Sequence, residues 1–232
     1  MKILLISDIH ANIEALSAIN EDFDALLCMG DLVDYGPSPK ECLAFLKDKS
    51  SVIVRGNHDH AVAYREDCRC HGDYKPLSVA TRQLMWELLD DAEIEFLRKL
   101  PLHECVWLGG ARFFLCHAAP SDPLFQYLPS NSPEEVWERE MGDIKADYIL
   151  LGHTHEPFQI QIGDQWVINP GSVGQPKGDG PLVSYAVWQD GEVLLKKVPY
   201  DFERTITKIK QTSLEPQIKA GLRHILRFGS LA

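Results

Sequence analysis

The chain of 232 residues contains no long apolar run. Its N-terminal apolar segment, residues 2–6, ends at Ser7 and Asp8 and is therefore too short for the core of a signal peptide. No other stretch approaches the roughly 18 apolar residues that a membrane-spanning helix requires. We therefore predict a cytoplasmic protein with reduced cysteines and no membrane partner.

Positive charge is also scarce. Lysine and arginine number 23 against 34 aspartates and glutamates, which gives a net charge of −11. Proteins that bind long nucleic acids are usually basic, so this balance argues against a nuclease or a nucleic-acid-coating protein. It does not exclude an enzyme that acts on a small nucleotide, because bound divalent cations would offset negative charge locally.

Paired cysteines with the spacing of a zinc knuckle are missing as well. Of the six cysteines, Cys68 and Cys70 are separated by one residue instead of two, and no second pair complements them. We expect this pair, together with His71, to be structural or incidental.

Short apolar runs alternate with helical patterns in the first two thirds of the chain. Runs of four to six residues bounded by glycine and polar residues predict buried strands at 2–6, 25–29, 51–54, 112–116 and 148–151. Apolar residues at helical spacing predict helices at 13–19, 39–48, 77–100 (one long helix or two) and 133–142. This alternation predicts an α/β domain.

The last third has a different pattern. Four strand-like runs occur between residues 158 and 198, and Gly163-Asp164 and Asp190-Gly191 are typical of hairpin turns. We expect antiparallel strands that extend a mixed sheet or form a second one. The remaining residues, about 203–232, predict a helical tail packed on the edge of a single domain that spans residues 1–232.

Polar side chains stand at the carboxyl ends of the five predicted strands, where open α/β sheets bind ligands. They are Asp8, His10, Asp31, Asn57, His58, His117, His153 and His155. Any one of them would ordinarily be a turn residue or a helix cap. Five strand ends that carry such residues toward one sheet edge instead predict a metal site.

The types of ligand restrict the choice of ion. Carboxylate, imidazole and carboxamide groups without thiolate suit Mn, Fe, Zn or Ni. The set is too large for one four-coordinate ion. It favours two ions about 3.5–4 Å apart, bridged by a carboxylate and a hydroxide, an arrangement that stabilises the attacking and leaving oxygens of an in-line displacement.

The ordered residues resemble the calcineurin-like metallophosphoesterase superfamily from residue 1 to about residue 175. The resemblance rests on Asp8-Ile-His10, Gly30-Asp31, Gly56-Asn57-His58-Asp59, His117 and Gly152-His153-Thr-His155. Two further stretches are similar to its small prokaryotic phosphodiesterase branch, which is grouped with diadenosine tetraphosphatase-like proteins. They are Asp31-Leu-Val-Asp-Tyr-Gly-Pro and Asn169-Pro-Gly-Ser-Val-Gly-Gln-Pro.

The resemblance implies a four-layer α/β/β/α sandwich of two mixed sheets that holds two divalent ions, with Mn favoured over Fe, Zn, Ni and Mg. It also allows a homodimer. It assigns one ion to Asp8, His10, Asp31 and His155. It assigns the other to Asp31, Asn57, His117 and His153, so that Asp31 bridges the two.

The same resemblance gives His58 a catalytic role and no metal. Water bound to a metal reaches a pKa near 7 and supplies the nucleophile, whereas the leaving oxygen still needs a proton. A histidine suits that task near neutral pH, and a carboxylate partner would fix its tautomer. The family pattern favours Asp34 as this partner, with Asp59 as the alternative.

Tyr35 departs from the pattern of the protein-phosphatase branch. In that branch the same position is an arginine that binds the phosphate. Loss of that bidentate contact argues against a serine/threonine protein phosphatase. The substrate phosphate would then be bound by the metals, Asn12 and backbone amides, which suits a diester better than a doubly charged monoester.

The sequence therefore predicts a two-metal phosphodiesterase that acts on a small nucleotide or a similar diester. A phosphomonoesterase, a dinucleoside polyphosphate hydrolase and a non-catalytic protein-interaction scaffold of the same fold are the alternatives. Loops at 64–76, 118–132 and 169–180 are placed to line the pocket and set its specificity.

Overall fold

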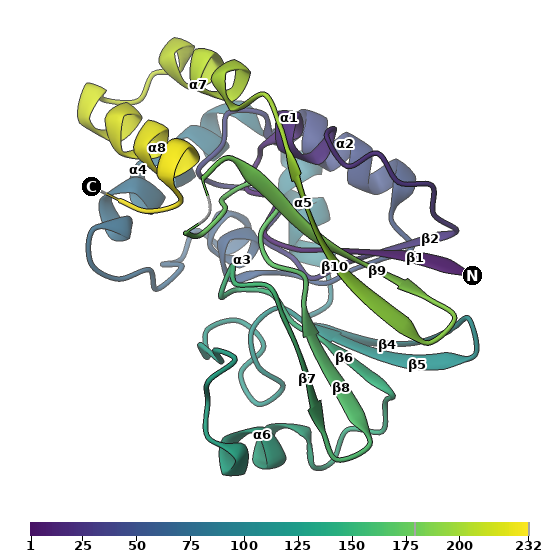
Figure 1. Cartoon of the computed structure of the whole chain (residues 1–232). Helices are drawn as coiled ribbons and strands as arrows, with labels where there is room; N and C mark the ends of the chain where they lie inside the picture. Colours follow the sequence, from purple (N-terminus) through teal and green to yellow (C-terminus); the bar gives the residue numbers. More distant parts are fainter. Residues whose placement is uncertain (179, 232) are drawn as a thin grey trace.

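The computed structural model describes residues 1–178 and 180–231, and its centre is a pair of five-stranded β-sheets (Figure 1). The first sheet has the order β10-β9-β1-β2-β3. Its strands are β1 (Lys2–Ile6), β2 (Ala25–Cys28), β3 (Val52–Ile53), β9 (Leu182–Gln189) and β10 (Glu192–Pro199). β1, β2 and β3 pair in parallel, whereas β9 and β10 are antiparallel, so the sheet is mixed.

The second sheet has the order β4-β5-β6-β8-β7. Its strands are β4 (His103–Leu108), β5 (Ala111–Cys116), β6 (Tyr148–Leu150), β7 (Phe158–Ile162) and β8 (Gln165–Asn169). β5, β6 and β8 are parallel, and the edge strands β4 and β7 pair antiparallel to their neighbours. Both predicted hairpins are present, as β7–β8 and β9–β10.

Alternating side chains divide the core between the two faces of each sheet. In β1, Ile3 and Leu5 point into the layer between the sheets, where they join Phe113 and Leu150 of the second sheet. Their neighbours along β1 point to the opposite face, because successive side chains of a strand alternate. Inner strands such as β1 and β2 are therefore apolar on both faces and require cover on the outside, whereas the edge strands β4 and β10 are largely exposed.

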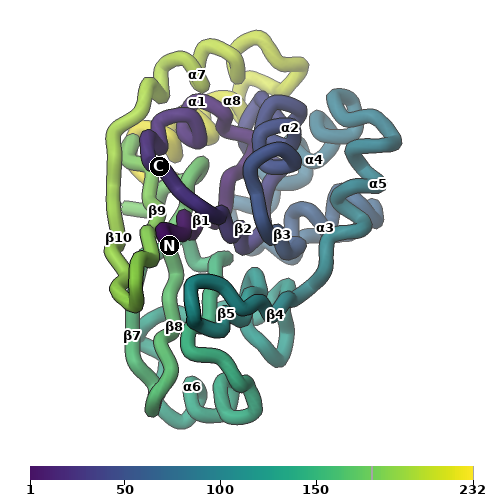
Figure 2. The backbone as a smooth tube through the Cα atoms, turned by 90° about the vertical axis from the view of Figure 1, so that its right-hand side faces the viewer, coloured from purple at the N-terminus to yellow at the C-terminus, as the bar shows by residue number. Residues whose placement is uncertain are grey.

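Helices provide that cover. α1 (Ile13–Leu16), α2 (Pro39–Lys49), α3 (Asn57–Tyr64), α4 (Tyr74–Leu88), α5 (Asp91–Lys99), α7 (Phe202–Gln211) and α8 (Pro216–Phe228) share the core on the outer face of the first sheet. α6 (Glu134–Met141) packs Trp137 and Met141 against the second sheet, at the opposite end of the molecule (Figures 1 and 2). The layers are thus helix, sheet, sheet and helix, which confirms the predicted fold class.

The structure decides one open assignment and changes others. Of the two alternatives for the segment 77–100, the structure has two helices, because Asp90 and Glu93 cap α5 reciprocally through hydrogen bonds of 2.9 Å. The tail also forms two helices, α7 and α8. The short helix α3 and the exposed edge strand β4 were not predicted. Within the described residues, no helix has the length and apolarity to cross a membrane.

Candidate active site

The residues that follow the strands adopt an unusual backbone conformation. Asp8, His10, Asp31, His153 and His155 all have positive φ, between 46° and 64°. This left-handed region costs an L-residue about 1–2 kcal/mol. Such strain is concentrated at functional sites, where the surrounding structure enforces it. Here it turns the chain sharply after β1, β2 and β6 and directs these side chains toward one another.

The first cluster consists of Asp8, His10, Asp31 and His155, whose ligand atoms lie within 4.8 Å of one another. His155 Nε2 lies 3.2 Å from His10 Nε2 and 3.2 Å from Asp8 Oδ1. His10 Nε2 lies 3.8 Å from Asp31 Oδ2. These are the four residues that the family resemblance assigns to one ion.

The tautomers of this cluster suit a cation. Nδ1 of His10 is 3.1 Å from the carbonyl of Val33, and Nδ1 of His155 is 2.9 Å from the carbonyl of Gln175. A carbonyl only accepts, so each Nδ1 carries the proton and each Nε2 presents a lone pair. Two lone pairs that face each other repel unless a cation lies between them. Metal-binding histidines characteristically donate their second N–H in this way.

The second cluster consists of Asp31, His117 and His153, again within 4.8 Å. His117 Nε2 lies 3.3 Å from Asp31 Oδ2 and 3.0 Å from Asn57 Oδ1, while its Nδ1 faces the carbonyl of Met29 at 2.7 Å. The amide of Asn57 donates through Nδ2 to a backbone carbonyl at 2.8 Å, which orients Oδ1 toward His117. All seven predicted metal ligands thus lie together, and Asp31 belongs to both clusters.

Burial and neighbouring charges shift the pKa values of these groups. Burial lowers the pKa of His10 to about 3 and that of His153 to about 4, which keeps both rings neutral. Burial would raise the pKa of Asp31, but the His117 and His58 rings outweigh it and hold that pKa well below its usual range. Burial would also lower the pKa of His117, yet the facing Asp31 raises it to about 9. A cation bound here would displace that proton.

His58 lies outside both clusters. Its Nδ1 is 2.7 Å from Asp34 Oδ2, and its backbone N–H donates to Asp31 Oδ1 at 2.9 Å. Burial would lower the pKa of the His58 ring, but the neighbouring Cys70, Asp31 and Asp34 raise it well above its usual value. The structure therefore places a protonatable imidazole, oriented by a carboxylate, directly beside the predicted metal ligands.

Asp59, the alternative partner of His58, has a different task. Its carboxylate accepts hydrogen bonds of 2.8–2.9 Å from the backbone N–H groups of Asp31, Leu32 and Gly56. Asp59 therefore connects the turn after β2 to the start of α3. Of the two candidate carboxylates, Asp34 is the one that contacts the His58 ring.

Asn12, which was predicted to help bind the substrate phosphate, is not among the residues that line the pocket described below. Its Oδ1 accepts from Ala15 N at 3.2 Å and so caps α1, and it also accepts from the Thr205 hydroxyl at 3.0 Å. Its Nδ2 donates to Gly174 O at 3.0 Å and to Tyr200 Oη at 3.2 Å. Because every polar atom of the side chain is committed to these contacts, Asn12 ties the late loop and the tail to the first sheet.

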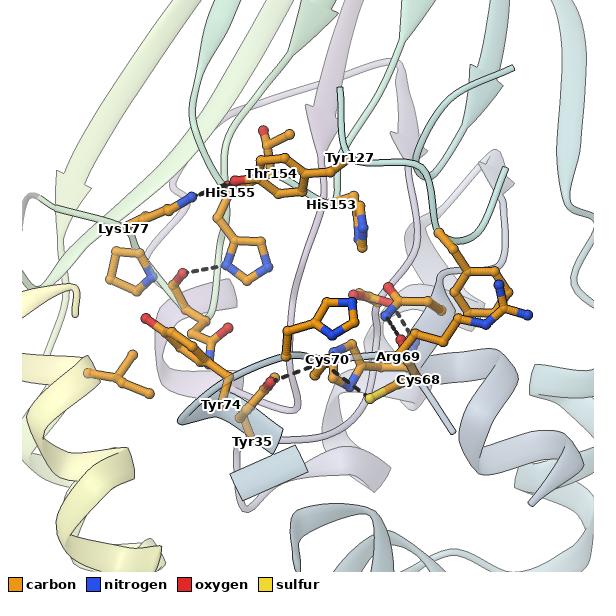
Figure 3. A pocket seen from close by; sticks show the side chains of 18 of the residues that line it. Tyr35, Cys68, Arg69, Cys70, Tyr74, Tyr127, His153, Thr154, His155 and Lys177 are labelled. Carbon is orange, nitrogen blue, oxygen red and sulfur yellow. Dashed lines mark hydrogen bonds between the residues drawn. The ribbon is translucent and has the colours of Figure 1, made fainter. Parts of the chain in front are cut away.

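A pocket of about 560 Å³ opens above the two clusters. Figure 3 shows side chains from three loops converging on it. The contributing residues include Cys68, Arg69, Cys70 and His71 from the first loop with Tyr74 at the start of α4, Asp122, Phe125 and Tyr127 from the second loop, and Gln175, Pro176 and Lys177 from the third. All three loops were predicted to line the site, although residue 179 of the third lies outside the described residues.

The sequence prediction missed one wall of the pocket, and it missed one contact made by a loop that it did place there. Ile225 and Gly229, at the end of α8, line one wall, whereas the tail was expected at the domain edge. Cys68 and Cys70 also lie in the pocket, beside His58. Their one-residue spacing matches no ligand pattern, so only their position in the fold reveals the proximity.

The two-sheet sandwich and its Asp/His clusters define a metallohydrolase with its site at the carboxyl ends of parallel strands. Residues 1–190 match the family model of the calcineurin-like phosphoesterase superfamily domain. The chain therefore belongs to the calcineurin-like phosphoesterase superfamily and is a metal-dependent phosphoesterase.

Individual relatives agree with this assignment. The chain is 30% identical to the uncharacterized protein MJ0912 of Methanocaldococcus jannaschii, over 91% of this chain and 93% of that protein. It is 26% identical to the phosphodiesterase YfcE of Escherichia coli, over 84% and 90% of the two chains. Among solved structures, a metallophosphoesterase from Sphaerobacter thermophilus superposes with a TM-score of 0.80 at 26% identity, over 96% and 98% of the two chains.

Proposed function

We propose that this phosphoesterase is a two-metal phosphodiesterase that acts on a small diester, with a nucleotide as the favoured substrate class. The carrying observation is the pair of ligand clusters that share Asp31, with the His58–Asp34 pair alongside them. The similarity of this chain to the phosphodiesterase YfcE also supports hydrolysis of a phosphodiester. Manganese is the favoured ion, because hard oxygen ligands combine here with imidazole.

The ligand clusters would hold the two ions, one bound by Asp8, His10, Asp31 and His155 and the other by Asp31, Asn57, His117 and His153. When bound, the ions supply Lewis-acid activation of water and neutralise charge on the phosphate. The chain itself fixes the ligand geometry through the carbonyls that hold the Nδ1 atoms of three of the histidines.

His58 would protonate the leaving oxygen through Nε2. Asp34 holds Nδ1 at 2.7 Å, so it fixes the ring and favours the protonated imidazole. Neither residue is needed as a ligand, because both clusters are complete without them. This separation of roles makes the proposal testable, since removal of the ring should affect turnover and leave the metal count unchanged.

The pocket supports a diester of modest size. Its volume falls within the range of about 300–1,000 Å³ that is usual for small-molecule sites. Lys177 already pairs with Glu156 at 3.0 Å, and the Arg69 guanidinium lies 3.9 Å from the Phe125 ring centre. Both pocket cations are thus partly committed, which favours a singly charged phosphate. Tyr74, Phe125 and Tyr127 offer faces on which a base could stack.

The test is hydrolysis of bis(4-nitrophenyl) phosphate and 4-nitrophenyl phosphate by protein stripped of metal and resupplied with Mn²⁺. We expect activity to require the metal and to be faster on the diester. Faster hydrolysis of the monoester would instead support a phosphomonoesterase. Two bound ions without activity on either compound, or on dinucleoside polyphosphates, would support the scaffold.

A further inference from the structure

The loop between α3 and α4 places two thiols against the His58 ring. Cys68 Sγ lies 3.2 Å from Cys70 Sγ, and Cys70 Sγ lies 3.3 Å from His58 Nε2. The three ligand atoms all lie within 4.8 Å of one another. Figure 3 shows Cys68 and Cys70 at the floor of the pocket, on the opposite side from His153 and His155.

The backbone holds this arrangement in place. Arg69, between the two cysteines, has a left-handed φ of 60°, and its guanidinium lies over the Phe125 ring. The carbonyl of Cys68 accepts a hydrogen bond of 2.8 Å from Asn57 Nδ2. Because the chain turns at Arg69, the thiols of Cys68 and Cys70 lie next to each other although one residue separates them in the sequence.

We propose that Cys68, Cys70 and His58 form a third cation site, distinct from the two Asp/His clusters, that takes a thiophilic divalent ion such as Zn²⁺. Two thiolates and one imidazole are a ligand set that selects zinc over the harder ions. The fourth coordination position would face the pocket. Because this set contains sulfur and the two Asp/His clusters do not, the sites differ in the ions that they prefer.

The surroundings of His58 meet the requirements of a zinc ligand. Asp34 accepts a hydrogen bond of 2.7 Å from His58 Nδ1–H, which leaves Nε2 to bind a metal, as in carboxylate–histidine–zinc arrangements. Tetrahedral bonds of about 2.3 Å to sulfur and about 2.0 Å to nitrogen would place the ligand atoms roughly 3.5–3.8 Å apart. The contacts of 3.2 and 3.3 Å need to widen only slightly to admit the ion.

Occupation of this site would stop catalysis. This consequence rests on the proposed function, in which His58 Nε2 carries the proton for the leaving oxygen. An ion on Nε2 would take the place of that proton and would also narrow the pocket. The enzyme would then be activated by Mn²⁺ in the two Asp/His clusters and inhibited by Zn²⁺ on the thiols.

The binding test uses Co²⁺ as a probe, added to the Mn²⁺-loaded protein in the presence of a thiol-free reductant. Thiolate ligands give Co²⁺ a charge-transfer absorption in the near ultraviolet, which the sulfur-free clusters cannot produce. We expect this band, with one equivalent of Co²⁺, in the wild type and in Cys105→Ser, whose cysteine is exposed on β4. We expect it to be absent from Cys68→Ser/Cys70→Ser and weakened in Cys70→Ser.

No thiolate band in the wild type would overturn the site, as would a band that survives in the folded double variant. Circular dichroism checks that the variants are folded, and Cys70→Ser alone serves if the double variant is not. The inhibition test compares each variant with and without Zn²⁺. We expect the wild type to lose at least about 10²-fold in rate, the lower end of what loss of a general acid costs, and the double variant to be insensitive to Zn²⁺.

The two tests separate the two proposals. A thiolate band with no change in rate would uphold the cation site and contradict the role of His58 as the acid. Hydrolytic activity with no thiolate band would uphold the phosphodiesterase and overturn the third site.

Discussion

The Asp31 carboxylate accepts a hydrogen bond of 2.9 Å from the backbone N–H of His58 through Oδ1, while Oδ2 faces His117 at 3.3 Å. One side chain therefore contacts a ligand of the predicted metal centre and also anchors the N-terminus of the helix that carries the proposed acid. Displacement of Asp31 would disturb both, whereas truncation of the His58 ring would leave this backbone bond intact.

Replacement of His58 by alanine should reduce turnover with little loss of metal. The ring is proposed as a proton donor, and removal of a general acid typically costs roughly 10²- to 10⁴-fold in rate. The measurement is kcat on the diester together with metal content by elemental analysis. His103→Ala, on the exposed edge strand β4, is the matched control. Loss of a full equivalent of metal from the His58 variant would make the ring a ligand instead.

Asp31→Asn should lower occupancy at both metal positions. Asparagine keeps the size of the side chain but removes the negative charge that two cations would share. Calorimetric titration of the stripped protein with Mn²⁺ should show both binding events weakened. Asp122→Asn, a carboxylate on the pocket wall outside both clusters, is the control. Two ions bound with wild-type affinity would argue against a bridging carboxylate.

Gly56→Ala should act on the metal site through Asp31. A Cβ at position 56 would come within 2.0 Å of Asp31 Oδ1 and 2.4 Å of Asp31 N. Alanine suits the φ of −87° at this position, so the effect is steric: the new methyl group displaces both the carboxylate and the backbone of Asp31. We expect weaker Mn²⁺ binding and lower turnover. Gly221→Ala, inside α8, meets only the flexible ends of the Leu77 and Leu231 side chains, and the variant should bind Mn²⁺ normally.

Glu21 should stabilise the protein in a pH-dependent manner. Hydrogen bonds from Lys196 and Lys2 lower the pKa of Glu21 from 4.5 to about 2, and Tyr185 also donates to it. A depressed carboxyl pKa contributes stability above pH 4.5 that is lost as the pH falls toward 2. Glu21→Gln should lower stability by about 1 kcal/mol at neutral pH.

Thermal unfolding measures this effect, with a decrease in Tm of about 2–4 °C expected at pH 7 for a chain of this length. The difference from the wild type should shrink on acidification through the window between pH 4.5 and 2. Glu192→Gln, at the exposed start of β10, should leave Tm unchanged. A Glu21 variant with the wild-type Tm at pH 7 would show that the two lysines do not stabilise the fold.

The sequence was informative wherever a buried strand ended in a turn. Apolar runs predict strands because both faces of the parallel strands are covered, and the polar residues that follow must then lie at one edge. Local patterns failed where tertiary contacts decide. α3 begins with Asn57-His58-Asp59-His60, which shows no apolar periodicity, and the sequence does not distinguish Asn12 from the ligands beside it. Only its contacts with Gly174 and Tyr200 do so.

The pocket wall formed by Ile225 and Gly229 lies in a different part of the sequence from the residues of the reacting centre. The family match covers residues 1–190 and includes every residue of the two Asp/His clusters, whereas this wall comes from the last turn of α8 and its cap. Relatives could thus diverge in substrate by altering their final helix while the reacting centre stays the same. An exchange of C-terminal helices between relatives would be a direct route to new substrate ranges.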